Sequence, residues 1–473
     1  MRSRMMGRRI AGIVGVVLAA STASPKQGFA ADSSSGSQPP ASQPISNSPS
    51  DPGVRGRAPG AGGPLPGLSI AEQNFFAASR NRFRAVYSVS GTLNDAPAGI
   101  INAPVSARAT TPTAARLAIR NRRSAALARR QPGGRPRDLG WRTEHYPFVH
   151  HTIGPVREAR FVSNPDGSPD GGVHDLYVIT GRSDAPGCSI AQPDFAVAIR
   201  QNNIIFRIPT PIFGAGRVEN TPNLNLENDA AALARQRKAN EVSGVFNRSG
   251  NDGTITRFGW KAQNKSLLMF AGEAYNVEVG VTNELFPNER DDTVGCQFNP
   301  LPEDATFLVE SGLSNSPASD LSADIVNFAA FSRLAAGPAP APATTSTTRG
   351  QRAFNNVGCN LCHIAQQKTA SLLFTGQSNV TYSPFSDFQL HEMGSGLQDR
   401  ITQGQATGTQ FRRAPLWCVG QRIFFLHDGR TQDLLQAIKD HSSNGSEANT
   451  VIDNFNALPK SSQQDILNFL RSL

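Results

Sequence analysis

The pentapeptide Cys359-Asn360-Leu361-Cys362-His363 has the spacing C-x-x-C-H. Two thiols at this spacing can add across the two vinyl groups of a haem, and the following histidine can bind the iron as its proximal ligand. A structural disulfide or half of a zinc site is the alternative. Zinc would require a second pair of ligands, and the only other nearby thiol is Cys418. The sequence therefore predicts one covalently attached haem c, held by Cys359, Cys362 and His363.

A haem iron also takes a ligand on the side opposite the proximal histidine, and four residues after the motif are candidates. They are His391, Met393, His427 and His441. Gly394 would let the backbone approach the porphyrin closely. A thioether ligand raises the reduction potential and suits electron transfer, whereas a second imidazole lowers it. We predict Met393 as this ligand, with His391 as the alternative; a methionine that only fills the core is the other interpretation.

Other polar residues near the motif are candidates for contacts with the haem propionates. Arg412 and Arg413 could bind them, with a solvated surface pair as the alternative. His427 directly precedes a helix that Thr431 would cap, and we expect it to hydrogen-bond a propionate or the Asp428 side chain.

The first thirty residues have the features of a secretory signal. Arginines precede an apolar run at 10–20 that is too short to anchor in a bilayer, and small residues allow cleavage after Ala23 or Ala30. No later segment is apolar enough to cross a membrane. We therefore expect residues 1–30 to be a cleavable signal peptide and the mature protein to be periplasmic or otherwise exported, with no integral membrane segment.

The formal net charge of +9 does not indicate a nucleic-acid partner, because the basic residues are concentrated in two places. One is the signal peptide. The other is the segment 108–142, which holds ten arginines and one aspartate. The rest of the chain is mildly acidic, so no nucleic-acid binding is predicted.

Composition divides the remaining chain into segments. Residues 31–66 are rich in Ser, Pro and Gly and are expected to be a disordered tether. A larger N-terminal domain is predicted at 67–335, interrupted at 96–146 by an atypical Arg/Ala-rich segment. A Pro/Ala linker at 336–348 leads to a cytochrome c-like haem domain at 349–473. The predicted fold is mainly α with short strands and much coil, and the C-terminal domain is predicted to be all-α.

Individual elements follow from caps and periodicity. Strands are predicted at 175–179 and 203–207. Helices are predicted from Ser69 through Phe83, at 323–334, from Thr348, and from Ser461 or Ser462 to the C-terminus.

Two cysteines, Cys188 and Cys296, lie in Gly/Pro/Asp-rich loops of the N-terminal domain. In an oxidising compartment they could form a disulfide. Their distance cannot be derived from the sequence, so two free thiols remain the alternative.

Several motifs occur in an order that resembles the bacterial di-haem oxidoreductases, which are related to the di-haem cytochrome c peroxidases. Members of this family carry the names peroxidase or thiol oxidoreductase. The resemblance runs from about Leu68 to the C-terminus and is interrupted by the basic segment. The motifs are Gly154-Pro-Val-Arg-Glu-Ala-Arg160, Phe206-Arg-Ile-Pro-Thr-Pro211, Gly259-Trp-Lys-Ala262, Phe385-Ser-Asp387, Leu390-His-Glu-Met-Gly394 and Phe425-Leu-His-Asp-Gly-Arg430.

The resemblance implies two haems: a C-terminal one that transfers electrons and an N-terminal one that meets peroxide, within a cytochrome-peroxidase-like N-terminal domain. It implies a small redox protein or another electron donor as partner. Glu273 and Glu278 are candidate acid/base residues for peroxide, with solvated or salt-bridged roles as the alternative. Trp260 could relay electrons between the haems, with a buried structural role as the alternative.

One part of the family pattern is missing. The first C-x-x-C-H belongs where the basic segment stands, and that segment contains no cysteine. If the segment is read one nucleotide out of frame, Ala115-Arg-Leu-Ala-Ile119 becomes compatible with Cys-Ala-Ala-Cys-His. We hypothesise a frameshift between roughly Ala96 and Tyr146. As written, the chain supports one haem, so an electron-transfer cytochrome and an inactive remnant are the alternatives to a peroxidase.

Overall fold

A computed structural model describes residues 48–56, 60–84, 86–88, 102–104, 157–173, 179–180, 189–191, 193–278, 281–288, 293, 302, 304–306 and 322–473. Four sequence-based predictions fall outside these residues: the signal peptide at 1–30, nearly all of the segment at 96–146, the Cys188–Cys296 disulfide, and most of the strand at 175–179.

Helices dominate the described residues, and the strands pair only in two-stranded sheets. The helices are α1 Ile70–Phe83, α3 Phe195–Arg200, α4 Ala215–Glu219, α5 Asn223–Ala239, α6 Leu267–Val277, α8 Asp324–Leu334, α9 Thr345–Asn356, α10 Gly394–Leu397, α11 Leu434–Lys439, α12 Asn449–Ala457 and α13 Lys460–Ser472. The strands are β1 Val86–Ser88, β2 Asn102–Pro104, β3 Glu158–Phe161, β4 Ile179–Thr180, β5 Ser189–Ile190, β6 Ile204–Arg207, β7 Gln367–Lys368, β8 Thr381–Tyr382, β9 Leu390–Glu392 and β10 Gln410–Arg412. Pairing is parallel for β1–β2 and antiparallel for β3–β6, β4–β5, β7–β8 and β9–β10.

This architecture confirms the predicted mainly helical fold with short strands. The C-terminal part, predicted to be all-α, also contains β7 to β10. Polar, Gly- and Pro-containing sequence lies between α9 and α11, and it forms short ladders and turns rather than long helices.

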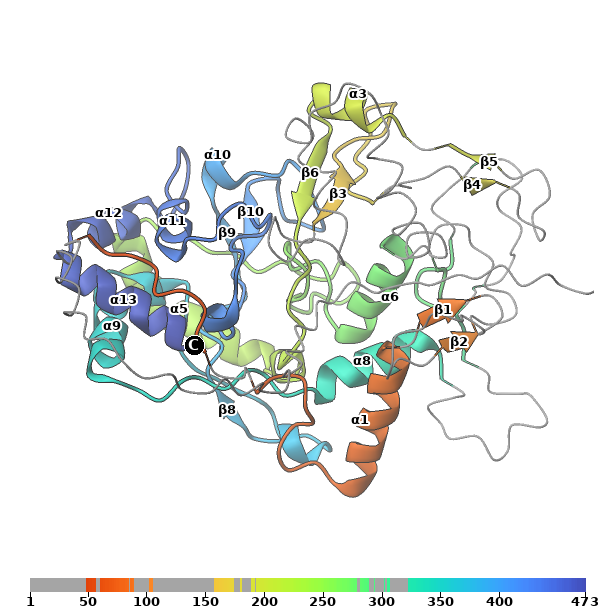
Figure 1. Cartoon of the computed structure of the whole chain (residues 1–473), viewed down its shortest axis with the longest axis horizontal. Helices are drawn as coiled ribbons and strands as arrows, with labels where there is room; N and C mark the ends of the chain where they lie inside the picture. The colour runs from red at the N-terminus through yellow and green to blue at the C-terminus, as the bar shows by residue number, and fades with distance from the viewer. Residues whose placement is uncertain are drawn as a thin grey trace, which may run out of the picture.

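Helices α1, α6 and α8 form one packed group (Figure 1). Phe83 of α1 lies on Phe331 of α8, with ring centroids 4.7 Å apart. Ser69 caps α1 through a reciprocal capping box with Glu72. The predicted helices at 69–83 and 323–334 are therefore confirmed: α1 buries one face, and α8 is buried along most of its surface.

Helices α9 and α13 cross closely in the C-terminal part. Gly350 of α9 lies against the backbone of Asp465, and Phe354 and Phe469 pack edge-on with centroids 5.5 Å apart. Both helices begin earlier than predicted. α9 begins at Thr345 after a Thr344–Thr347 capping box, and α13 begins directly after Pro459.

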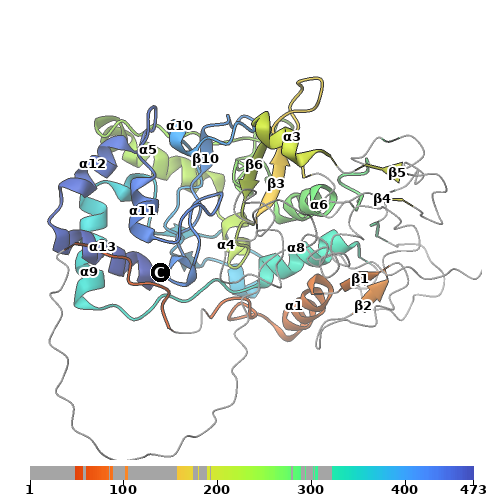
Figure 2. The same cartoon turned by 45° about the horizontal axis from the view of Figure 1, so that its top comes forward.

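Helix α5 precedes the predicted linker in sequence but lies among the C-terminal helices in both views (Figures 1 and 2). It contacts the turn Cys359–Leu361 that carries the haem motif. The β3–β6 ladder confirms the predicted strand at 203–207, and the residue after β6, Ile208, donates its N–H to the carbonyl of His427 at 2.7 Å. Contacts therefore cross the boundary predicted at 336–348.

The predicted tether at 31–66 is wrong for residues 48–56, which pack on the C-terminal part, and for residues 60–66, which pair with the end of α8. The Asp51 carboxylate receives two hydrogen bonds from Arg471 of α13, at 2.5 and 2.6 Å. Leu65 is buried and pairs with the backbone of Leu334. An ion pair and backbone hydrogen bonds hold a segment whose composition offers little apolar surface. Among the described residues, no helix combines the length and apolar character that crossing a membrane requires.

Candidate haem site and carboxylate cavity

The haem motif begins where α9 ends. Gly358 has φ +100°, a conformation that L side chains rarely adopt, and it turns the chain into a 3-10 turn at Cys359–Leu361. Within the described residues, Cys359 and Cys362 are free cysteines and pack against the apolar cluster of Val242, Leu361 and Val451. Burial raises the pKa of Cys359 to about 12. Both cysteines therefore offer unpaired sulfurs within the motif that His363 completes.

His363 presents one ring nitrogen for ligation. Its Nδ1 lies 2.9 Å from the carbonyl oxygen of Phe385, and a carbonyl can only accept, so Nδ1 carries the proton and Nε2 carries the lone pair. Burial, with the charge of Arg413 as the next cause, lowers the pKa of His363, so the ring is neutral. Metal-binding histidines have this arrangement, because the second hydrogen bond fixes the ring and its tautomer.

Arg413 lies beside two of the candidate second ligands. Its Nη1 donates to Nε2 of His441 at 3.1 Å, and its Nη2 contacts Sδ of Met393 at 3.4 Å. Its Nε is buried and has no hydrogen-bond partner among the described residues. Arg412 instead donates to the carbonyl of Gly259 at 2.8 Å. Two thiols, an imidazole with a free Nε2 and an incompletely paired arginine fit a haem c with anionic propionates.

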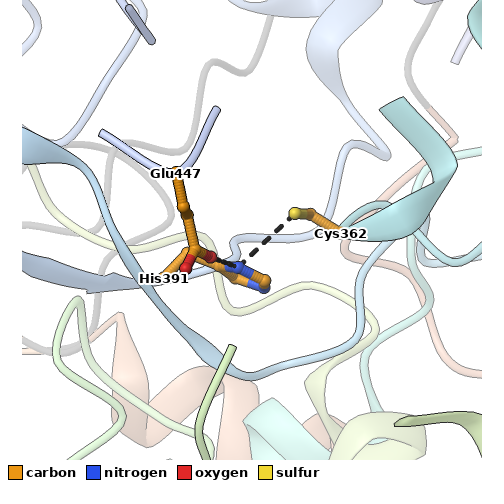
Figure 3. A group of neighbouring side chains, drawn as sticks. All are labelled: Cys362, His391 and Glu447. Atoms are coloured by element: carbon orange, nitrogen blue, oxygen red, sulfur yellow. Dashed lines mark hydrogen bonds and ion pairs between the residues drawn. The ribbon is translucent and has the colours of Figure 1, made fainter. Parts of the chain in front are cut away.

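His391 belongs to a group of ligand-type side chains with Cys362 and Glu447 (Figure 3). Its Nδ1 contacts Glu447 and lies 3.4 Å from Sγ of Cys362, and its Nε2 lies 2.8 Å from Asp387. Burial acts to lower the pKa of His391, but the electrostatic interactions with Cys362 and Asp387 outweigh it and raise the pKa well above 6.5. Both ring nitrogens are thus engaged. Haem attachment would use the Sγ atom of Cys362, which also belongs to this group.

Arg237 of α5 contacts the haem motif and also a buried aspartate next to it. Its Nε donates to the carbonyl of Leu361 at 2.9 Å, and its Nη2 forms a 2.7 Å ion pair with Asp387. The residue is 3% exposed. No local pattern marks Arg237 in the sequence, because its partners lie more than a hundred positions away.

A second group of polar residues surrounds a cavity of about 30 Å³ lined by both predicted acid/base residues and Trp260. Glu273 of α6 accepts hydrogen bonds from Gln263, at 3.0 Å, and from Asn264. Glu278 at the end of α6 accepts from Arg160 at 3.1 Å. A cavity of this size holds about one or two water molecules.

Arg160 also joins Glu278 to a carboxylate that the sequence analysis did not single out. Its Nη2 donates to Glu158 at 2.8 Å, so one nitrogen contacts both carboxylates. Burial, followed by the charge of Glu158, raises the pKa of Glu278 well above 4.5. Glu158 and Arg160 occupy alternate positions of β3, and that strand pattern was the available signal.

The cavity wall contains two unsatisfied buried atoms. Oε1 of Gln263 and Nε of Arg160 have no hydrogen-bond partner among the described residues. The Gln263 amide must direct its NH₂ at the Glu273 carboxylate, which can only accept, so its orientation is fixed. Two residues of the lining therefore carry one acceptor and one donor without a partner among the described residues.

Trp260 lies between the cavity and the Met393 side of the molecule. Its Nε1 donates to the carbonyl of Ile208 at 2.7 Å, and its ring belongs to an apolar cluster with Met393 and Phe411. His427 stacks on Phe411 with ring centroids 4.2 Å apart, and burial lowers its pKa to about 4.

Asp428 was predicted as one possible hydrogen-bond partner of His427. In the structure its carboxylate accepts hydrogen bonds from Arg430 at 2.8 and 3.1 Å. Glu273, Glu278 and Trp260 line one cavity, and their roles as acid/base residues and as an electron relay stay predictions. Met393 as the second iron ligand stays a prediction.

Comparison with known proteins identifies the family. A search of curated proteins finds no significant match. The family model described as "Di-haem oxidoreductase, putative peroxidase" matches residues 158–473, well over half of the chain. The matched interval contains the haem motif and the cavity residues, whereas the resemblance predicted for residues before it stays a prediction. The chain belongs to the di-haem oxidoreductase family.

Proposed function

We propose that this chain is an exported c-type haem oxidoreductase that passes electrons through a haem attached to Cys359 and Cys362 and ligated by His363. The observation that carries the proposal is the His363 ring. Its Nδ1 is held by the Phe385 carbonyl, so Nε2 carries the lone pair, and the two cysteines of the same motif are unpaired among the described residues. When bound, the haem supplies one-electron chemistry.

We further propose peroxide as the substrate, which is the substrate class implied by the family description. Reducing peroxide to water consumes protons, and the cavity offers groups to deliver them. The raised pKa of Glu278 keeps this carboxyl protonated above its ordinary range, which suits a proton donor. Glu273 is oriented by Gln263 and Asn264 and suits an acceptor that positions peroxide.

Trp260 supports electron transfer between the two regions. Its ring lines the cavity and also packs in the cluster that contains Met393. The buried indole and its hydrogen bond to Ile208 hold the ring in one orientation. We propose that electrons from the C-terminal haem reach the cavity region past this side chain.

A second function, a non-enzymatic periplasmic electron-transfer cytochrome, is favoured by one observation. The printed sequence contains a single C-x-x-C-H, at Cys359–His363, whereas the family name implies two haems. In that case the chain would exchange electrons with a small redox protein, and the carboxylate cavity would serve only the fold.

Haem stoichiometry and peroxide turnover separate these functions. The wild type, C359A/C362A and E278Q would be produced in a host that attaches haem c, and haem per chain would be measured as the pyridine haemochrome. One covalent haem, with peroxide-driven oxidation of the reduced protein that is slowed about 100-fold or more in E278Q, supports the peroxidase. One haem without turnover supports the electron carrier. A wild type that binds no covalent haem overturns both.

A further inference from the structure

His441, just beyond the end of α11, has a ring held in the same way as that of His363. Its Nδ1 lies 2.8 Å from the carbonyl oxygen of Ala437, one turn earlier in the chain. The carbonyl accepts, so Nδ1 carries the proton and Nε2 carries the lone pair. Among the candidate second ligands, His441 thus has the tautomer and the fixed orientation that metal-binding histidines use.

The lone pair of His441 already faces a cation. Nη1 of Arg413 donates to Nε2 at 3.1 Å, and Nη2 of the same guanidinium contacts Sδ of Met393 at 3.4 Å. Two candidate ligand atoms therefore converge on one side chain. Arg413 is an incompletely paired partner, because its Nε is buried without an acceptor among the described residues.

Accessibility separates the two candidates. His363, His441 and Arg413 are all partly exposed, whereas Met393 is 2% exposed and packs with Trp260 and Phe411. A porphyrin covers a large flat surface, and its ligands must border surface that the ring can cover. His441 borders such a surface, whereas Met393 is enclosed by the apolar cluster that contains Trp260 and Phe411.

The backbone around Met393 restrains it further. Its N–H donates to the carbonyl of Thr409 at 3.0 Å, and its carbonyl accepts from the Ser443 hydroxyl at 3.1 Å. Moving the thioether to an iron would remove apolar contacts and disturb a fixed backbone. His391 has both ring nitrogens engaged, and His427 is stacked on Phe411.

We propose that Nε2 of His441 would be the second protein ligand of the C-terminal haem iron, in addition to His363, and that Met393 is a core residue beside Trp260. This inference rests on the proposed haem attachment at Cys359 and Cys362. It replaces the methionine favoured from sequence by a second imidazole, which lowers the reduction potential of the haem. Arg413 would then exchange its contact with His441 for a haem propionate.

The test compares the wild type with H441A and M393L, each matured with covalent haem and each counted by pyridine haemochrome. We expect the ferric wild type and M393L to be low-spin without the near-infrared charge-transfer band of thioether ligation. We expect H441A to lose the low-spin spectrum, to regain it with added imidazole, and to shift in midpoint potential, whereas M393L keeps the wild-type potential.

A thioether band in the wild type that disappears in M393L would overturn the inference and leave the proposed function standing. So would an H441A spectrum identical to that of the wild type. A wild type with no covalent haem would overturn the proposed function and this inference together. If H441A does not fold, the spectra of the wild type and M393L still decide between the two ligands.

Discussion

Arg237 joins the two parts of the chain at a single side chain. It hydrogen-bonds the carbonyl of Leu361 inside the haem motif and forms an ion pair with Asp387, with both charged groups almost fully buried. A buried pair of this kind contributes most visibly when one partner is removed, because the remaining charge is left without compensation.

Replacement of Arg237 by alanine is therefore expected to destabilise the protein by about 3–5 kcal/mol. The measurement is denaturant unfolding of the haem-loaded protein. The matched control is R248A, which breaks the exposed 2.8 Å pair with Glu227 and should cost no more than about 1 kcal/mol. Equal losses in the two variants would show that Arg237 does not hold the motif.

Asp304 gives a pH dependence with a defined sign. Its carboxylate accepts hydrogen bonds from the backbone N–H groups of Asp324 and Ile325 at the start of α8, at 2.6 and 3.1 Å. Burial, followed by the charge of Asp324, raises its pKa from 3.8 to about 7. Between these values the folded protein retains a proton that the unfolded chain has lost, so stability should fall as pH rises from about 4 to about 7.

The check is the free energy of unfolding of the wild type and D304N across this pH interval. The amide introduced by D304N would keep one oxygen acceptor for the helix start and would not titrate, so the variant should lose this part of the pH dependence. Parallel curves for the two proteins would contradict the assignment to Asp304.

At the scale of elements, the crossing of α9 and α13 is the closest helix contact around the haem motif. A Cβ at Gly350 would overlap the backbone carbonyl of Asp465 and come within 2.8 Å of Cβ of Phe469. Alanine normally stabilises a helix relative to glycine, by about 1 kcal/mol. Here the two helices would have to separate.

G350A is accordingly expected to destabilise the protein by about 1–3 kcal/mol, or more, measured as a lower midpoint of thermal or denaturant unfolding. G250A is the control, because no atom lies within 4 Å of a Cβ added there. A stabilised G350A variant would mean that the helices do not approach as closely as described.

Elements were predictable where the signal is local. Ser69 and Glu72 form a reciprocal cap within four residues, and the aromatic residues of α1 and α8 repeat at helical spacing, so these helices were assigned correctly. The starts of α9 and α13 were missed because several Ser and Thr residues compete as caps. In the structure the Thr344–Thr347 capping box sets the start of α9, and Pro459 sets the start of α13.

At the scale of the whole molecule, the haem motif was readable because its chemistry lies within five consecutive residues. The residues that surround the motif in space could not be predicted from the sequence. Arg237 and Asp387 are 150 positions apart, Arg160 and Glu278 are 118 apart, and Arg471 and Asp51 are 420 apart. Such pairs are brought together by topology and leave no spacing in the sequence. For the same reason the segment around Asp51 was mistaken for a tether.

The origin of the basic segment is also a question about the whole molecule, because the family match begins only at residue 158. The frameshift hypothesis predicts that the codons of Ala114 and Leu117 both end in T, which would create the cysteine codons of a first C-x-x-C-H in the shifted frame. Sequencing the DNA of this interval checks it. Any other third base in either codon excludes the hypothesis.

Covalent attachment of iron porphyrin to Cys359 and Cys362 is the claim on which the remaining functional proposals depend, and extraction with acidified acetone tests it most directly. Protein exported from a host with haem-ligation machinery should keep its colour after extraction, at one haem per chain, and C359A/C362A should be colourless. Complete transfer of the colour from the wild type into the acetone would contradict the account.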